Sequence, residues 1–186
     1  GVLTLVKAFM QAAGLAQGSA NAQSDDQDAQ VIPDVWDLHI VGDGPERGAI
    51  EQLIASAGPQ AVSRIHLLGY KSGEDLQREV GNARFTVLSS EWRENMPYSG
   101  LESLAAQTPI IGARIGGIPE LVEEGKTGVT FESGDAVDLL NSMRKCSAVS
   151  ASSYSSMQRF CREYVNARCL QNKYALTLID LYERVI

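Results

Sequence analysis

The stretch LHIVGDGP, Leu38 to Pro45, joins a short apolar segment to a turn of glycine, aspartate and proline. An apolar run of this length that is bounded by turn residues indicates a buried strand. Proline directly after such a turn is favoured at the first position of a helix. The stretch therefore predicts a strand over 38–42, followed by a helix that begins at Pro45 and runs to about residue 58.

The same alternation continues along the chain. Four more apolar segments predict strands: RIHLLGY (64–70), RFTVLSS (84–90), PIIGA (109–113) and GVTF (128–131). Helical segments are expected between them, from Ser72 to about Asn82 and from points near Ser99, Pro119 and Asp135. Short apolar strands that alternate with helices are typical of a parallel sheet covered on both faces. The expected fold class is therefore α/β, a doubly wound, parallel, Rossmann-like sheet.

The two ends of the chain depart from this alternation. Residues 2–15 have helical spacing of apolar residues, the polar segment 17–30 suggests a surface loop, and two helical segments without strands follow Ser147. A Rossmann-like unit normally begins with a strand. We therefore expect its first strand to be missing from this sequence, although a sheet with one strand fewer would also fit. A single domain over 1–186 is expected, with an α/β core (1–146) and C-terminal helices (147–186).

Composition excludes several classes of function. The 186 residues carry a net charge of −7 and are 44% hydrophobic, which argues for a globular domain and against nucleic acid as the main partner. Cys146, Cys161 and Cys169 lack C-x-x-C spacing, which favours reduced thiols in a cytosolic protein. His39 and His66 both lie in strand-like segments, so no histidine metal site is expected. The apolar runs are too short to cross a membrane, and no signal peptide is expected at the start.

The candidate site lies in ENMPYSGLE, Glu94 to Glu102. In a parallel sheet, ligands bind beyond the carboxyl ends of the strands, and this stretch follows the third strand. A helix that starts near Ser99 would direct its N–H groups into that crevice, where they could hold a phosphate. Gly100 would let a ligand approach the backbone closely. The alternative is purely structural: Ser99 and Glu102 also fit the S-x-x-E capping box, and Glu94 would then be a solvated loop acid.

The sequence resembles a known family in four segments that occur in the same order. They are GDGPER, LLGY, the pair Glu94 and Glu102 with seven residues between them, and GGIPELVEEGKTG (116–128). The family is the donor-binding, C-terminal domain of retaining GT-B glycosyltransferases of the group 1 (family 4) type. The resemblance extends from Gly1 to about Leu140 and more weakly to the end of the chain.

The resemblance implies roles for individual residues. Glu94, the catalytic candidate, would contact hydroxyls of the donor sugar, and Glu102 would bind the ribose. The N–H groups of Tyr98 and Ser99 would receive the diphosphate. The remaining expected donor-binding residues are Asn95, Pro97 and Gly100 in the same loop and helix, and Gly69, Tyr70 and Lys71, where Tyr70 and Lys71 would line the nucleobase.

Two further points concern this edge of the sheet. Pro97 stands where many family members have glycine, and because proline has no N–H, one donor contact is lost or replaced. Gly116 and Gly117 are expected mainly to shape the loop before Pro119.

The resemblance also implies an activity: transfer of a glycosyl group, with retention, from a nucleoside-diphosphate sugar to a saccharide or lipid-linked acceptor. No metal or other cofactor is expected. Bacterial cell-envelope polysaccharide synthesis is the implied setting, in the cytoplasm and at the inner face of the membrane. The acceptor-binding domain is absent from the sequence, so the chain alone is expected to be inactive. The alternatives are a non-catalytic domain that binds nucleotide sugars and a sugar-nucleotide epimerase of the same fold.

Overall fold

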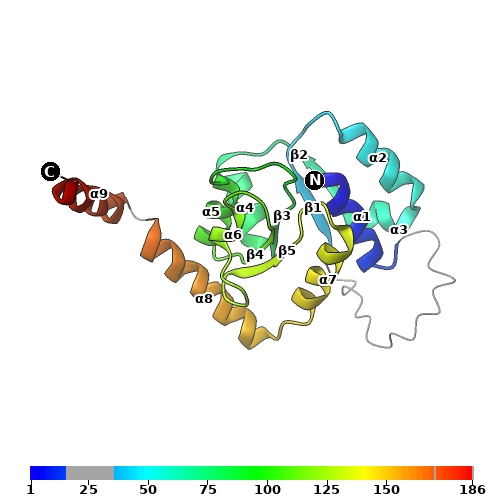
Figure 1. Ribbon diagram of the computed structural model, residues 1–186. Helices are drawn as coiled ribbons and strands as arrows, with labels where there is room; N and C mark the ends of the chain where they lie inside the picture. Colours follow the sequence, from blue (N-terminus) through cyan, green and yellow to red (C-terminus); the bar gives the residue numbers. More distant parts are fainter. Residues whose placement is uncertain (16–35, 170, 186) are drawn as a thin grey trace.

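The computed structural model describes residues 1–15, 36–169 and 171–185, so the predicted loop 17–30 lies outside the described residues. Its helices and strands alternate over most of the chain (Figure 1). In order they are α1 Val2–Ala12, β1 Leu38–Val41, α2 Arg47–Ser56, α3 Pro59–Arg64, β2 Ile65–Gly69, α4 Gly73–Asn82, β3 Thr86–Leu88, α5 Tyr98–Ala105, β4 Ile110–Ala113, α6 Ile118–Leu121, β5 Gly128–Phe131, α7 Ala136–Ser147, α8 Ala151–Arg168 and α9 Gln171–Val185.

All strand pairs in the described residues are parallel. β1 pairs with β2, and β3, β4 and β5 form a second sheet in that order. Helices cover both faces of the β1–β2 pair. Ile40 and Leu67 line a pocket together with residues of α1 and α2, whereas His39, which points to the opposite face, contacts Glu79 of α4. The expected doubly wound α/β fold is confirmed.

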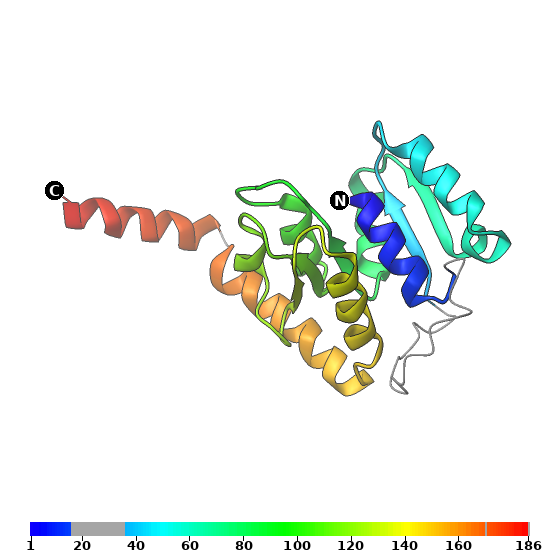
Figure 2. The same cartoon turned by 45° about the vertical axis from the view of Figure 1, so that its right-hand side comes forward.

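The two sheets meet where a strand would fit. In the common doubly wound order, the first strand lies between the second and the fourth. If β1 and β2 are the second and third strands and β3 is the fourth, that position falls between β1 and β3, which the described part of the chain leaves unpaired. Helix α1 lies across this junction (Figure 2): Gly1 packs against the Ser89 carbonyl after β3, and Val2 lines the pocket beside β1.

Two helix boundaries differ from expectation. The helix after β1 begins at Arg47 and not at Pro45, because the Arg47 N–H bonds to the Gly44 carbonyl (3.1 Å) and closes a turn. Pro45 takes the second position of that turn, which its fixed φ favours. Near residue 58, Gly58 adopts φ of 96° and Pro59 opens α3, a short helix that the apolar pattern did not predict.

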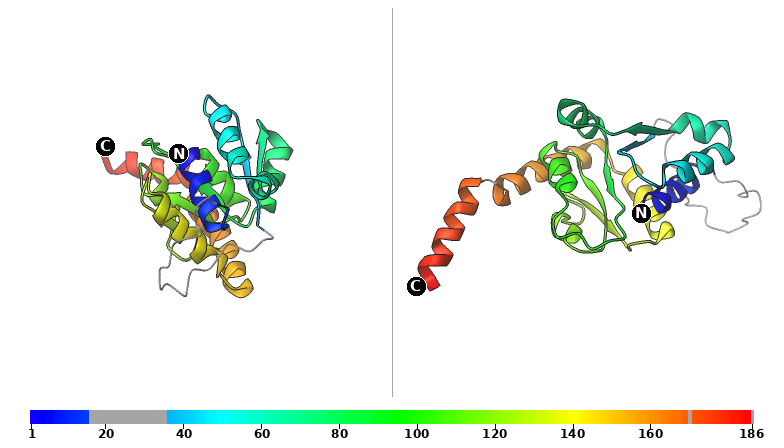
Figure 3. Two further views of the ribbon diagram at one scale, coloured as in Figure 1. Left: turned by 90° about the vertical axis from the view of Figure 1, so that its right-hand side faces the viewer. Right: turned by 90° about the horizontal axis from the view of Figure 1, so that it is seen from above.

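The C-terminal helices behave differently from each other. α8 is fixed to the start of β3: the Arg84 guanidinium lies over the Tyr154 ring (4.3 Å) and donates to the Val149 carbonyl (3.1 Å), while the Tyr154 hydroxyl donates to the Arg84 carbonyl (2.8 Å). α9 extends away from the body of the protein (Figure 3). No helix among the described residues is long and apolar enough to cross a membrane.

The three cysteines are expected to differ sharply in reactivity. Burial raises the pKa of Cys146 and of Cys161 to about 12, whereas Cys169 is exposed. At pH 8, a pKa of about 12 leaves roughly one thiol in ten thousand ionised, and only the thiolate reacts with alkylating agents. Iodoacetamide should therefore modify Cys169 alone in the native protein, and all three cysteines after denaturation. Rapid native labelling of Cys146 or Cys161, measured by mass spectrometry, would contradict this packing.

Candidate functional site

The stretch from Glu94 to Glu102 forms a loop and the start of α5, at the carboxyl end of β3. Pro97 is the N-cap of α5, buried, with extended backbone (φ −72°, ψ 112°). The helix begins at Tyr98, one residue before the expected start. Because proline at the N-cap has no N–H, it leaves no unpaired donor of its own at this helix end.

The first turn of α5 presents free backbone donors. The N–H groups of Gly100 and Leu101 bond to the Pro97 carbonyl, at 3.0 and 3.4 Å. Within the described residues, the N–H groups of Tyr98 and Ser99 donate to no acceptor, and both residues are exposed. Unpaired N–H groups at a helix N-terminus and the positive end of the helix dipole together favour an anion. This helix end therefore has the free donors and the positive potential that suit an anion.

The capping-box alternative is wrong. Ser99 lies inside α5, the N-cap is Pro97, and no side chain caps this helix. A capping box requires serine at the N-cap itself, so Ser99 and Glu102 stand two residues too far into the helix to form one. Glu102 consequently projects from the exposed side of α5. Its carboxylate makes no hydrogen bond or ion pair to any residue that the structure describes, and it is free to bind a ligand.

Glu94 is exposed, but the loop that carries it is tightly held. Its carboxylate accepts a hydrogen bond from the Ser90 hydroxyl, and its carbonyl accepts one from the Gly117 N–H at 2.8 Å. Gly116 and Gly117 pack on the Glu94–Asn95 backbone: a Cβ at Gly116 would lie 2.3 Å from the Glu94 carbonyl oxygen, and one at Gly117 would lie 1.9 Å from that of Asn95. These glycines therefore do more than shape the loop before Pro119.

Gly100 has a different role from the expected one. A Cβ at this position would lie 2.5 Å from Leu121 Cδ1 and 3.0 Å from Leu88 Cδ1. The glycine thus faces the core and lets α5 approach the sheet, and it does not open the backbone to a ligand. The fixed orientation of α5 is what aims the free N–H groups of Tyr98 and Ser99 away from the core.

The residues after β2 form a separate group. Gly69 adopts φ of 68°, and the Tyr70 side chain is 81% exposed. Lys71, half-buried, pairs with Glu79 of α4, with 2.5 Å between Nζ and Oε1. No hydrogen bond or ion pair in the described structure joins these residues to the stretch 94–102, although both groups follow the carboxyl ends of parallel strands. Tyr70 therefore presents a free aromatic ring on that edge, whereas Lys71 is already paired.

Glu79 gives this region a defined pH dependence. Hydrogen bonds from Lys71 and then from His39 lower its pKa below the ordinary value of 4.5. A carboxyl whose pKa is lower in the folded state adds stability above 4.5 and loses that contribution as the pH falls through the folded pKa. Glu79→Gln should therefore reduce the free energy of unfolding at pH 7, with a smaller reduction at pH 3.5. Urea denaturation at the two pH values measures this, and an equal effect at both would contradict it.

A pocket of about 390 Å³ lies beside the β1–β2 pair. It opens beside the turn after β1, between the start of α1 and α2, and none of the predicted site residues lines it. Its lining consists of Val2, Ile40, Val41, Gly42, Asp43, Gly44, Pro45, Glu46, Arg47, Ile50 and Leu67. Arg47 is half-buried at this pocket and pairs with Glu51 at 2.9 Å.

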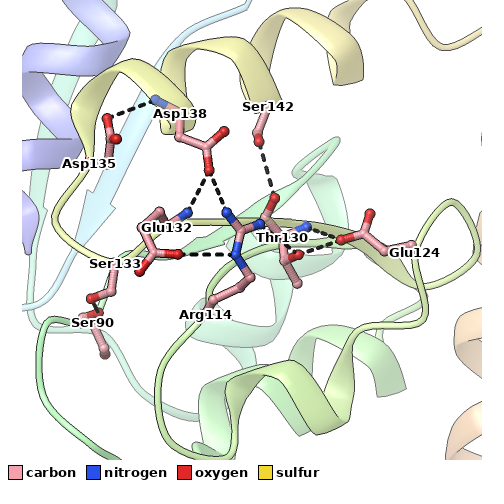
Figure 4. A network of polar contacts seen from close by, with 9 residues as sticks. All are labelled: Ser90, Arg114, Glu124, Thr130, Glu132, Ser133, Asp135, Asp138 and Ser142. Atoms are coloured by element: carbon pink, nitrogen blue, oxygen red, sulfur yellow. Dashed lines mark hydrogen bonds and ion pairs between the residues drawn. The ribbon is translucent and has the colours of Figure 1, made fainter.

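Sequence reasoning missed one set of contacts at the site. The Ser90 hydroxyl donates to the Glu94 carboxylate. From the loop after β5, the Ser133 hydroxyl donates to the Ser90 carbonyl at 2.9 Å (Figure 4). Both residues are ordinary serines in loops, and neither belongs to a recognisable motif. Only the pairing of β3 with β4 and of β4 with β5 brings their loops to the same edge, so no local signal could have identified them.

Known proteins resemble this chain over most of its length. A family model described as "Glycosyl transferases group 1" matches residues 23–148. Sulfoquinovosyl transferase from Arabidopsis thaliana is 33% identical over 110 residues, which cover 58% of this chain and 20% of that protein. N-acetyl-alpha-D-glucosaminyl L-malate synthase from Bacillus anthracis is 36% identical over 98 residues, which cover 53% of this chain and 24% of that protein.

Solved structures share the fold. The Anabaena protein HepE in complex with UDP superposes with a TM-score of 0.73 at 20% identity, over 97% of this chain and 45% of that one. Sucrose-phosphate synthase from Thermosynechococcus elongatus gives 0.72 at 24% identity, over 100% of this chain and 42% of that one. The chain thus spans less than half the length of these proteins.

Proposed function

Because this chain belongs to the group 1 glycosyltransferases, we propose that it is the donor-binding half of a two-domain enzyme and holds a nucleoside-diphosphate sugar at the start of α5. One observation carries the proposal: two unpaired N–H groups, from Tyr98 and Ser99, lie at a helix N-terminus, and in the sequence this helix start stands between Glu94 and Glu102, whose side chains are both exposed. The donors suit a diphosphate, and carboxylates suit the hydroxyls of sugars.

The chemistry follows from this placement. Departure of the nucleoside diphosphate leaves negative charge on its phosphate, and oriented N–H donors stabilise charge that develops in the transition state. Because the helix N-terminus supplies that positive potential, the proposed donor site uses no metal ion. Glu94 orients the sugar and Glu102 anchors the ribose, so the anomeric carbon is held between two fixed points. The exposed ring of Tyr70 is available to the nucleobase.

A UDP-linked sugar is the first donor to test, because solved neighbours with this fold hold UDP, and one of them is in complex with UDP-glucose. From the family resemblance, we further propose retention at the anomeric carbon, a saccharide or lipid-linked acceptor, and a place in bacterial cell-envelope polysaccharide synthesis, on the cytoplasmic side of the membrane. The acceptor would bind the second domain of the full enzyme.

The chain alone is expected to bind nucleotide weakly and to transfer no sugar. A strand inserted between β1 and β3, and the loop after it, would complete the edge on which α5 opens. We propose that the full enzyme supplies both, together with cationic residues that would neutralise the leaving diphosphate. Sugar transfer by these 186 residues, measured with a radiolabelled donor, would contradict this part of the proposal.

Calorimetric titration with UDP, GDP and ADP tests the proposal. One nucleotide should bind saturably, and Glu102→Ala should weaken its binding by about ten- to a hundredfold, since a hydrogen bond to a charged group contributes roughly 1.5–3 kcal/mol. Glu183→Ala, a matched change on the projecting helix α9, should leave the affinity unchanged. Absence of binding to all three nucleotides, or equal effects of the two substitutions, would overturn the proposed site.

A further inference from the structure

The loop that carries Glu94 is fixed by contacts from two separate segments, one after β3 and one before α6. Ser90, just past β3, donates its hydroxyl to the Glu94 carboxylate. Gly117, just before α6, donates its N–H to the Glu94 carbonyl at 2.8 Å and packs against the Asn95 carbonyl. The side chain and the backbone of the same residue are therefore held from different directions.

Ser90 is itself anchored. Its carbonyl accepts a hydrogen bond from the Ser133 hydroxyl at 2.9 Å, and Ser133 lies on the loop between β5 and α7 (Figure 4). Asp138 at the start of α7 fixes that loop: it accepts the Glu132 N–H at 2.7 Å and pairs with Arg114 Nη2 at 2.8 Å. The backbone hydrogen bond from Glu132, supported by Arg114, lowers the pKa of Asp138, so this carboxylate stays charged at neutral pH.

A polar path therefore runs from the first turn of α7, through Ser133 and Ser90, to the carboxylate of Glu94. An exposed glutamate in a loop ordinarily samples several rotamers, and holding it in one of them costs conformational entropy on binding. A carboxylate that is already hydrogen-bonded on one oxygen avoids part of that cost. Its second oxygen is left for a ligand.

We propose that Ser90 is a positioning residue that orients the Glu94 carboxylate toward the sugar of the donor, with Ser133 holding Ser90 in place. This inference rests on the proposed function for the role of Glu94, and it adds a residue that touches neither the nucleotide nor the sugar. If Ser90 has this role, loss of its hydroxyl should weaken recognition of the sugar and not of the nucleoside diphosphate.

The first test separates these two contributions. The affinities of the chain for UDP and for UDP-glucose are compared in Ser90→Ala and in Ser89→Ala, its neighbour whose hydroxyl contacts neither Glu94 nor Ser133 in the described structure. If GDP or ADP is the nucleotide that binds, GDP-mannose or ADP-glucose replaces UDP-glucose. Ser90→Ala should lower the ratio of the affinity for UDP-glucose to the affinity for UDP by about tenfold. The affinity for UDP itself should change by less than about twofold. Ser89→Ala should change neither.

A double-substitution cycle strengthens this test. In a Glu94→Ala background, Ser90→Ala should have no further effect, because residues that act through one contact are not additive. Equal weakening of UDP and UDP-glucose by Ser90→Ala would overturn the positioning role while the proposed function stands. The positioning role would also be overturned if the effects of Ser90→Ala and Glu94→Ala on the affinity for UDP-glucose were additive, or if the unsubstituted chain bound UDP and UDP-glucose equally well. Absence of any nucleotide binding would overturn the proposed function and the role of Glu94 with it.

The second test needs no ligand. Because the Gly117 N–H bonds to the Glu94 carbonyl, its hydrogen exchange reports how firmly the loop is held. Ser90→Ala and Ser133→Ala should both accelerate exchange at Gly117, by about tenfold, whereas Ser89→Ala should not. Unchanged exchange at Gly117 in both variants would show that the serines do not hold the loop, whatever the chain binds.

Discussion

Replacing Tyr98 by proline is expected to lower the affinity of the chain for a nucleoside diphosphate by about ten- to a hundredfold, because it removes one N–H donor from the proposed phosphate-binding site. The helix should tolerate the change. Tyr98 is the first residue of α5, where proline is favoured, and the preceding Pro97 already has the extended backbone that a following proline requires.

Tyr98→Ala is the matched control, since it removes the same side chain and keeps the N–H. The difference in affinity between the two variants, measured by calorimetry, isolates the backbone donor. Circular dichroism should show unchanged helix content in both. If both variants bind equally well, the N–H of Tyr98 does not contact the ligand, and the N-terminus of α5 is not where the diphosphate lies.

The second large effect is expected at Gly117. A Cβ there would lie 1.9 Å from the Asn95 carbonyl oxygen, which is backbone and cannot rotate away as a flexible side chain would. Gly117 has φ of −87°, which alanine adopts without strain, so the whole effect is steric. Gly117→Ala should therefore displace the Glu94–Asn95 loop. It should also lower the free energy of unfolding by about 1–3 kcal/mol, the usual cost of forcing atoms into a packed site.

Gly81→Ala provides the control for that prediction. Gly81 lies in α4 with no atom near the position of the added Cβ, so alanine should raise stability slightly, by about 0.5 kcal/mol. Urea denaturation of the two variants should show changes of opposite sign in the free energy of unfolding. A Gly117→Ala variant as stable as the unsubstituted chain, with unchanged affinity for UDP-glucose, would show that Gly117 does not pack against the Glu94–Asn95 loop.

Much of the fold could be predicted because it is encoded locally. Apolar runs bounded by turn residues placed each strand correctly to within a few residues, and the alternation with helices predicted their parallel pairing. Local patterns failed where competing turn chemistry decided the outcome. Pro45 fits a helix start and a turn equally well, and only the bond from Arg47 to Gly44 settles which one forms.

The site was predictable only in part, for a related reason. Glu94 and Glu102 could be identified because they belong to one short stretch with a recognisable spacing. The S-x-x-E pattern, in contrast, suggested a cap that does not exist, since the sequence does not specify that the helix begins one residue before Ser99. The contacts of Ser90 with Ser133, and of Gly117 with Glu94, join segments that are distant in sequence. They follow from the order of β3, β4 and β5, which no single segment encodes.

Binding of a nucleoside-diphosphate sugar at the start of α5 can be followed residue by residue through the backbone amide resonances of the ¹⁵N-labelled chain during titration with UDP-glucose. The largest chemical-shift changes are expected at Tyr98 and Ser99, with smaller ones at Glu94, Asn95 and Glu102. Shifts confined to the pocket beside the turn after β1, over residues 42–47, would contradict binding at this helix end, as would a spectrum that does not change at all.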